Sequence, residues 1–268
     1  ILILASWRTF CHKMECSFYF CPMPQNPQII YEDNHLLIIH KPAGWLVQGD
    51  RTGDRPLVDW GKAYLKKKYN KPGNVFLGVV HRLDRPVSGV VAMARTSKAL
   101  ARMNQIFKTR EVVKIYWAIV QNPPVQSEGT LVHWLIKDST KNRTNAFTAE
   151  KVGSKRAELS YRLLTQGNPP NPVPQRLLGK RGIYLLEVKP LTGRPHQIRV
   201  QLAALGCPII GDVKYGAAEP LSDASIALHA QKLSFIHPVK KESVSFCADI
   251  PVQDIWQPFV LVQEPKPN

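Results

Sequence analysis

Three short segments of the chain carry residue types that could do chemistry. In the first, Asp84 follows an apolar stretch and has Arg82 and Arg85 beside it. A carboxylate kept ionised by basic neighbours at the mouth of a sheet is a candidate reactive group, and loops on rigid elements are where such groups work. The alternative is a surface ion pair, which contributes only about 0–1 kcal/mol. The segments are His81-Arg82-Leu83-Asp84 with Ser88-Gly89, Lys114-Ile115-Tyr116-Trp117-Ala118, and residues 191–199.

The second and third segments place an aromatic and a basic side chain in regular elements. Tyr116 lies in a predicted strand, on the face opposite its apolar neighbours. It either belongs to the core or forms a stacking platform for a nucleic acid base. Arg199 lies in a predicted helix beside apolar positions, where an arginine can lay its stem over the core and keep its charge in water. His196 and Gln197, near the start of that helix, fit capping and packing as well as a function.

Hydrophobic periodicity and turn residues predict the elements that must position these side chains. Apolar and β-branched runs predict strands, and apolar residues at helical spacing predict helices. Pro56 opens the first helix, Ser97 caps the second and Gly206 follows the end of the third. The predicted strands span residues 36–39, 75–80, 90–94, 112–120, 131–136, 158–164, 183–189, 226–235 and 244–250, and the helices span 56–69, 97–107 and 192–205.

Many strands, few helices and no regular βαβ alternation predict an α+β fold, with flanking helices on a mixed, largely antiparallel β-sheet. The sequence contains no internal repeat and no domain linker, and the proline-rich stretch 168–174 fits an exposed loop. We therefore expect one domain over residues 29–262. Residues 1–28 differ in composition and are expected to be an appendage, and residues 263–268 a short tail.

The amino-acid composition indicates which class of partner the protein binds. Lys and Arg number 36 against 20 Asp and Glu, which gives a net charge of +16 and a pI near 9.8. Such an excess suits a polyanion, because basic side chains displace the counterions of a phosphate backbone, although a generally basic surface is also possible. No apolar run approaches the roughly 20 residues that span a bilayer. The five cysteines match neither a disulfide framework nor a zinc-ligand spacing, so we expect a reducing, cytoplasmic setting and no metal.

Taken together and in this order, the segments resemble the motifs of the RluA-type family of RNA pseudouridine synthases. Residues 81–84 with Ser88-Gly89 resemble the catalytic-aspartate motif, and Lys114-x-Tyr116-x-Ala118 resembles the second motif. Residues 192–200, with the glycines, Asp212 and Tyr215 after them, resemble the third. Residues 41–44 and 228–230 fit flanking signatures. The likeness extends from about residue 29 to residue 260, and five motifs in the right order are a specific signal.

The resemblance implies a role for each matching residue. Asp84 takes the place of the catalytic aspartate, and Arg82 that of an arginine that enters the RNA where the target base leaves. Tyr116 corresponds to the aromatic that stacks on the flipped uracil, and Arg199 to the arginine that pairs with the aspartate. The departures from the family pattern touch none of these four; they are Pro86-Val87, Gln201 and His40.

The family also implies a pseudouridine-synthase fold with a central active-site cleft, and an enzyme that isomerises uridines in ribosomal or transfer RNA. We expect a monomer without cofactor or metal, because the reaction transfers no electron and adds no group. Many members carry a small N-terminal RNA-binding domain. Residues 1–28 are too short to form one, so substrate choice is expected to rest on the catalytic domain.

Two other functions remain open at this point. A non-catalytic RNA-binding protein would explain the charge, but binding alone does not need a carboxylate that faces phosphates. A base-removing glycosylase could use an aspartate at C1′, but it would need a second acid to activate water, and we identify none in these motifs. The mass of the product separates the two chemistries, because isomerisation leaves the RNA mass unchanged.

Overall fold

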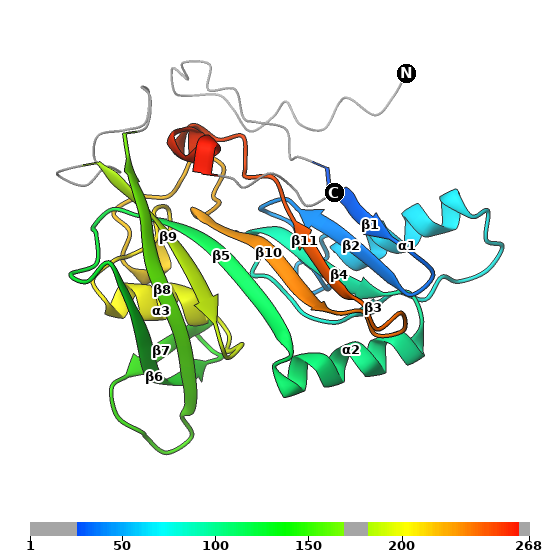
Figure 1. The fold of residues 1–268 in the computed structure, drawn as a ribbon, viewed down its shortest axis with the longest axis horizontal. Helices are drawn as coiled ribbons and strands as arrows, with labels where there is room; N and C mark the ends of the chain where they lie inside the picture. Colours follow the sequence, from blue (N-terminus) through cyan, green and yellow to red (C-terminus); the bar gives the residue numbers. More distant parts are fainter. Residues whose placement is uncertain (1–25, 169–181, 263–268) are drawn as a thin grey trace.

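The computed structural model describes residues 26–168 and 182–262, and its strands join into one sheet with helices on its faces (Figure 1). This confirms the α+β class and the largely antiparallel sheet. The elements are β1 (Gln28–Glu32), β2 (Leu36–Lys41), α1 (Leu57–Lys68), β3 (Gly78–Val79), β4 (Ser88–Ala94), α2 (Ser97–Thr109), β5 (Val112–Val120), β6 (Glu128–Asp138), β7 (Arg143–Phe147), β8 (Lys155–Gly167), β9 (Ile183–Pro190), α3 (Gln197–Ala204), β10 (Leu228–Ile236) and β11 (Ser243–Cys247), with short 3-10 helices at Val213–Tyr215 and Asp254–Val262.

The sheet runs in the order β1-β2-β4-β10-β5-β9-β8-β6-β7, with β11 beside β10 and β3 beside β4. Among the described strands, β4 and β10 form the one parallel pair and all other pairs are antiparallel. This pairing brings β4, which follows the Asp84 loop, to the middle of the sheet beside the strand pair β10 and β5. The three motifs therefore converge although they lie far apart in sequence.

The helices α1 and α2 cover opposite faces of the β1-β2-β4 part of the sheet. Successive strand residues point to opposite faces. Leu37 and Ile39 of β2 pack in the cluster that contains buried residues of α1, whereas Leu36 and Ile38 pack with Met103 of α2. In Figure 1, α2 accordingly lies apart from α1. The third helix, α3, packs on β6 and β7.

The boundaries of several predicted elements need correction. Thr96, not Ser97, caps α2, since its hydroxyl accepts the Ala99 N–H over 3.1 Å. The predicted strand 75–80 is reduced to β3, and the predicted helix 192–205 begins only at Gln197. Residues 192–196 form a loop instead, because Thr192 bonds the Gln197 side chain over 2.7 Å and the backbone of β8.

Two strands were not predicted at all. β1 has no clear alternation, and β7 lies in a polar stretch that reads as a loop. The predicted appendage and tail lie almost wholly outside the described residues, as does the proline-rich stretch from residue 169 onward. No helix in the described ranges is long and apolar enough to cross a membrane.

A glycine makes the parallel pairing of β4 with β10 possible. Gly89 is opposite Ala230 in the register and adopts a φ of +121°. A Cβ atom on Gly89 would lie 2.3 Å from the carbonyl oxygen of Ala230. Any larger residue would therefore have to separate the two strands, five residues after Asp84.

We expect Gly89→Ala to lower the free energy of unfolding by about 3 kcal/mol or more, because backbone strain and the steric clash add. Gly53→Ala is the matched control, since Gly53 also has a positive φ, +78°, but nothing lies within 4 Å of its Cβ position. It should cost only about 1–2 kcal/mol. Urea unfolding of both variants measures the difference, and equal losses would show that the strand contact is unimportant.

Candidate active site

Asp84 lies in the loop between β3 and β4, which is anchored on both sides. Leu83 and Val87 are buried, and the Val87 N–H donates to the Asp84 carbonyl oxygen over 3.1 Å. The Asp84 side chain is nevertheless 29% exposed. A firmly held turn thus presents a carboxylate that a ligand can reach.

A buried lysine anchors the same loop by hydrogen bonds to backbone carbonyl oxygens. Lys41, at the end of β2, is fully buried. Its ammonium donates to the carbonyl oxygens of Pro42, Trp45 and Arg85 over 3.0, 2.8 and 3.2 Å. Burial lowers the pKa of Lys41 to about 7; the charge of Asp84 opposes this shift and that of Arg85 adds to it. The sequence indicates Lys41 only as part of a flanking signature, and its hydrogen bond to the residue after Asp84 is visible only in the fold.

Arg199 pairs with Asp84, as predicted, and also with a second carboxylate. Its Nη1 donates to Asp84 Oδ2 over 2.9 Å, while Nε and Nη2 donate to the two oxygens of Asp212 over 2.7 and 2.8 Å. The Arg199 side chain is 7% exposed and that of Asp212 is 1% exposed. Burial lowers the pKa of Arg199, but the hydrogen bonds and charge of Asp212, with the charge of Asp84, raise it above its ordinary value. The alternative of a guanidinium that reaches into water is therefore wrong.

Asp212 is a second acid in these motifs, contrary to the expectation that they contain none. One signal of it is visible in the sequence, a charged residue within the apolar run that follows Gly206. Both of its oxygens are occupied by Arg199 and its side chain is almost inaccessible. It cannot position a water for attack, so the glycosylase alternative gains nothing from it.

The four predicted site residues line one cavity of about 120 Å³; they are Arg82, Asp84, Tyr116 and Arg199. Tyr116 is half-buried on β5, and burial, with the nearby charge of Asp84, raises its pKa above the ordinary value, which keeps the phenol neutral. Arg82 is exposed at the cavity wall and makes no hydrogen bond or ion pair to any residue in the described ranges. Its guanidinium is thus available to a ligand. Gln201, one of the departures from the family pattern, bonds to Leu131 of β6 and does not line the cavity.

His196 also lines this cavity; from the sequence, capping, packing and a function were all open for it. It precedes α3 with a φ of +54°, a left-handed conformation that few residues other than glycine adopt. Its Nδ1 is 2.8 Å from the hydroxyl of the buried Tyr215, and its Nε2 is 3.9 Å from Asp84 Oδ2. Thr144 of β7 donates its N–H to the same hydroxyl over 2.8 Å. A chain of contacts therefore runs from β7 to the carboxylate.

Comparison with known proteins agrees with this geometry. A family model described as RNA pseudouridylate synthase matches residues 35–204. The ribosomal large subunit pseudouridine synthase D of Zymomonas mobilis is 31% identical, over 93% of this chain and 80% of that protein. The tRNA pseudouridine synthase C of Vibrio vulnificus is 30% identical, over 86% of this chain and 92% of that one.

A solved structure, that of human RNA pseudouridylate synthase domain containing 4, superposes with a TM-score of 0.66 at 25% identity, covering 84% of this chain and 88% of the human one. Sequence motifs, fold and family model thus agree, and the chain belongs to the RluA-type family of RNA pseudouridine synthases, which are isomerases.

Proposed function

We propose that Asp84 is the catalytic carboxylate of this isomerase and that its substrate is a flipped uridine in ribosomal or transfer RNA. The observation that carries the proposal is the Arg199–Asp84 ion pair of 2.9 Å in the cavity that Tyr116 also lines. The named relatives modify both kinds of RNA. The domain over residues 29–262, a monomeric state and a cytoplasmic location belong to the same proposal.

The chemistry that these residues must support is a rearrangement. The N1–C1′ bond of uridine breaks, the uracil turns, and C5 bonds to C1′; C5 loses a proton and N1 gains one, so that composition is unchanged. Asp84 either attacks C1′ or removes the 2′ hydrogen. Since no electron leaves and no group is added, the proposal includes neither cofactor nor metal.

The other cavity residues supply binding and orientation. Extruding a base from its stack costs a few kcal/mol, and stacking on the neutral ring of Tyr116 would return about 1–3 kcal/mol. Arg82 is exposed at the cavity wall, and we expect its side chain to occupy the position that the base leaves. Arg199 holds Asp84 in one orientation, because its guanidinium is itself fixed by two bonds to Asp212.

We expect Asp84→Asn to abolish pseudouridine formation while folding and RNA binding persist, because the change keeps the shape and removes the charge. Asp54→Asn is the matched control, since Asp54 is an exposed aspartate paired with Arg85 of the same loop. The substrate is RNA from cells that lack the gene, treated with the parent or a variant protein. Pseudouridine mapping before and after this treatment measures the product, and an intact RNA mass shows that no base is lost. Turnover of Asp84→Asn within tenfold of the parent would remove Asp84 from the chemistry.

A second prediction separates the structural and catalytic roles of Arg199. Arg199→Met leaves the buried Asp212 without a partner, so we expect a loss of about 3–5 kcal/mol in the free energy of unfolding. Adding Asp212→Leu should restore most of that stability. Activity should stay lower by roughly a hundredfold in both variants, because Asp84 is no longer oriented. Urea unfolding and single-turnover rates test this, and recovery of activity in the double variant would show that Arg199 acts only through folding.

A further inference from the structure

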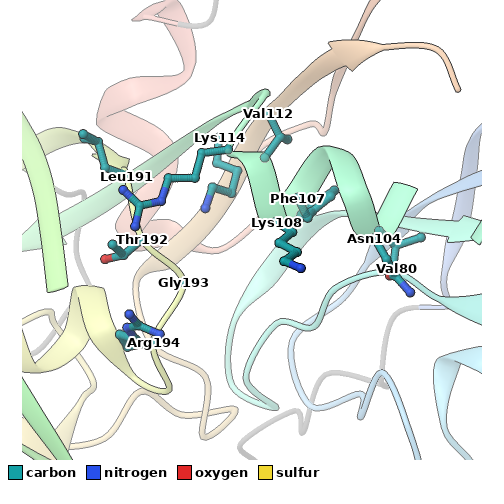
Figure 2. Close-up of a pocket in the computed structure, with 11 residues that line it drawn as sticks. Val80, Asn104, Phe107, Lys108, Val112, Lys114, Leu191, Thr192, Gly193 and Arg194 are labelled. Atoms are coloured by element: carbon teal, nitrogen blue, oxygen red, sulfur yellow. The ribbon is translucent and has the colours of Figure 1, made fainter. Parts of the chain in front are cut away.

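A second, larger cavity of about 490 Å³ adjoins the active site. One wall is the end of α2 with the start of β5, and the other is the loop before α3. Figure 2 shows Lys108 of α2 on one side and Thr192, Gly193 and Arg194 on the other. Lys114 and residues 192–194 line both this cavity and the one that contains Asp84. The two cavities are therefore continuous.

The walls of this larger cavity carry positive charge that the protein does not neutralise. Lys108, Arg110, Lys114 and Arg194 line it, and no Asp or Glu is among its described lining residues. None of the four forms an ion pair with a carboxylate of the described chain, although Arg194 donates to a backbone carbonyl. Burial, and then the charge of Arg110, lowers the pKa of Lys114. An anion here would relieve that repulsion.

Apolar side chains complete the walls. Leu191 is 45% exposed. The ring of Phe107 stacks on the ring of His81, at a centroid distance of 5.0 Å. Cations combined with aromatic and apolar surface are typical of grooves that take single-stranded nucleic acid, because phosphates and bases are bound together. A uridine in an unpaired strand is also the least costly one to flip, because no base pair has to be broken.

We propose that this groove binds the single-stranded RNA segment next to the target uridine, with its phosphates on Lys108, Arg110, Lys114 and Arg194. The inference rests on the proposed function, since it starts from a uridine held at Asp84. It also separates this groove from the basic run Lys66–Lys68 of α1. There Lys68 is already paired with Glu32 over 2.7 Å, and the run lines neither cavity.

The test compares two variants that each lose two positive charges. Lys108→Gln/Arg110→Asn removes them from the groove; asparagine suits the left-handed backbone of residue 110. Lys66→Gln/Lys67→Gln removes them from α1. With a fluorescein-labelled decauridylate as probe, we expect the groove variant to raise Kd about tenfold and to reduce the slope of log K against log salt by about 1.4. The α1 variant should stay within twofold of the parent, both in Kd and in the single-turnover rate.

Equal weakening by both variants, unchanged binding by the groove variant, or no binding of the probe by the parent would each overturn the groove. These failures are distinct from failure of the proposed function. A parent that forms pseudouridine while the groove variant binds normally refutes the groove alone. A parent that forms none refutes the proposed function whatever the groove binds.

A different observation carries a second inference, about His196. The Tyr215 hydroxyl accepts the Thr144 N–H and has one hydrogen of its own. His196 Nδ1, 2.8 Å away, and the Thr144 side chain are the acceptors near this hydrogen. If Nδ1 accepts, the neutral ring carries its proton on Nε2, which faces Asp84 Oδ2 at 3.9 Å. The opposite tautomer would point the Nε2 lone pair at the negatively charged carboxylate, which is electrostatically unfavourable.

We infer that His196 is a positioning residue whose Nε2–H orients the Asp84 carboxylate once the bound RNA closes the remaining gap. The ring stays neutral because burial lowers its pKa; Arg199, Lys214 and Lys137 act in the same direction, and Asp84 opposes them. The strained backbone of His196 fits this role, since it is the cost of placing a ring between Tyr215 and Asp84.

Two amide variants separate positioning from folding. His196→Asn fits the left-handed backbone and keeps an acceptor for Tyr215, but it has no group at the Nε2 position. His196→Gln offers a donor near that position on a less tolerant backbone. We expect the Asn variant to have a higher melting temperature than the parent, yet to react about tenfold slower in single-turnover assays at saturating RNA. The Gln variant should recover part of the rate. Rates that follow the melting temperatures, or parental rates in both variants, would overturn the inference.

Discussion

The buried guanidinium of Arg199 is the interaction on which the site depends. It joins α3, the segment at Asp212 and the Asp84 loop through three hydrogen bonds of 2.7 to 2.9 Å. A guanidinium suits this task better than an ammonium, because its planar donors can bind one carboxylate with two bonds and keep a third donor for another. The Asp212 side chain is buried, whereas the Asp84 side chain is partly exposed to solvent. One carboxylate therefore fixes the arginine, and the other is left to meet the substrate.

The sheet provides the frame that makes this pairing possible. The parallel pairing of β4 and β10 sets the Asp84 loop beside β5, and only a glycine at residue 89 allows that close approach. Lys41 then ties the chain after Asp84 to the end of β2. Such an arrangement costs stability in places, as the buried ammonium and the left-handed His196 show. Strain of this kind is concentrated where a site must be held in one geometry.

The distribution of charge connects the site to its substrate. A net charge of +16 predicts a polyanionic partner, but it does not say which surface binds it. The lysine run of α1 is the most conspicuous basic stretch of the sequence, yet one of its members is neutralised by Glu32. The basic side chains of the groove beside Asp84 have no carboxylate among its described lining residues. The sequence does not indicate this groove, because α2 and the loop before α3, which form it, are distant in the chain.

The sequence by itself determined the family, the α+β class, most of the strands and the four residues that meet in the cavity. It could do so because residues 112–120 of β5 are rich in β-branched and aromatic residues and because each motif is a local pattern. Only the tertiary structure decided that Asp212 shares Arg199, that α3 begins at Gln197 after a strained histidine, and that Lys41 supports the Asp84 loop. These features depend on contacts between segments far apart in sequence, where no local periodicity records the partner. The short or polar strands β1 and β7 were missed for the same reason, since pairing with their neighbours, not their own residue pattern, makes them strands.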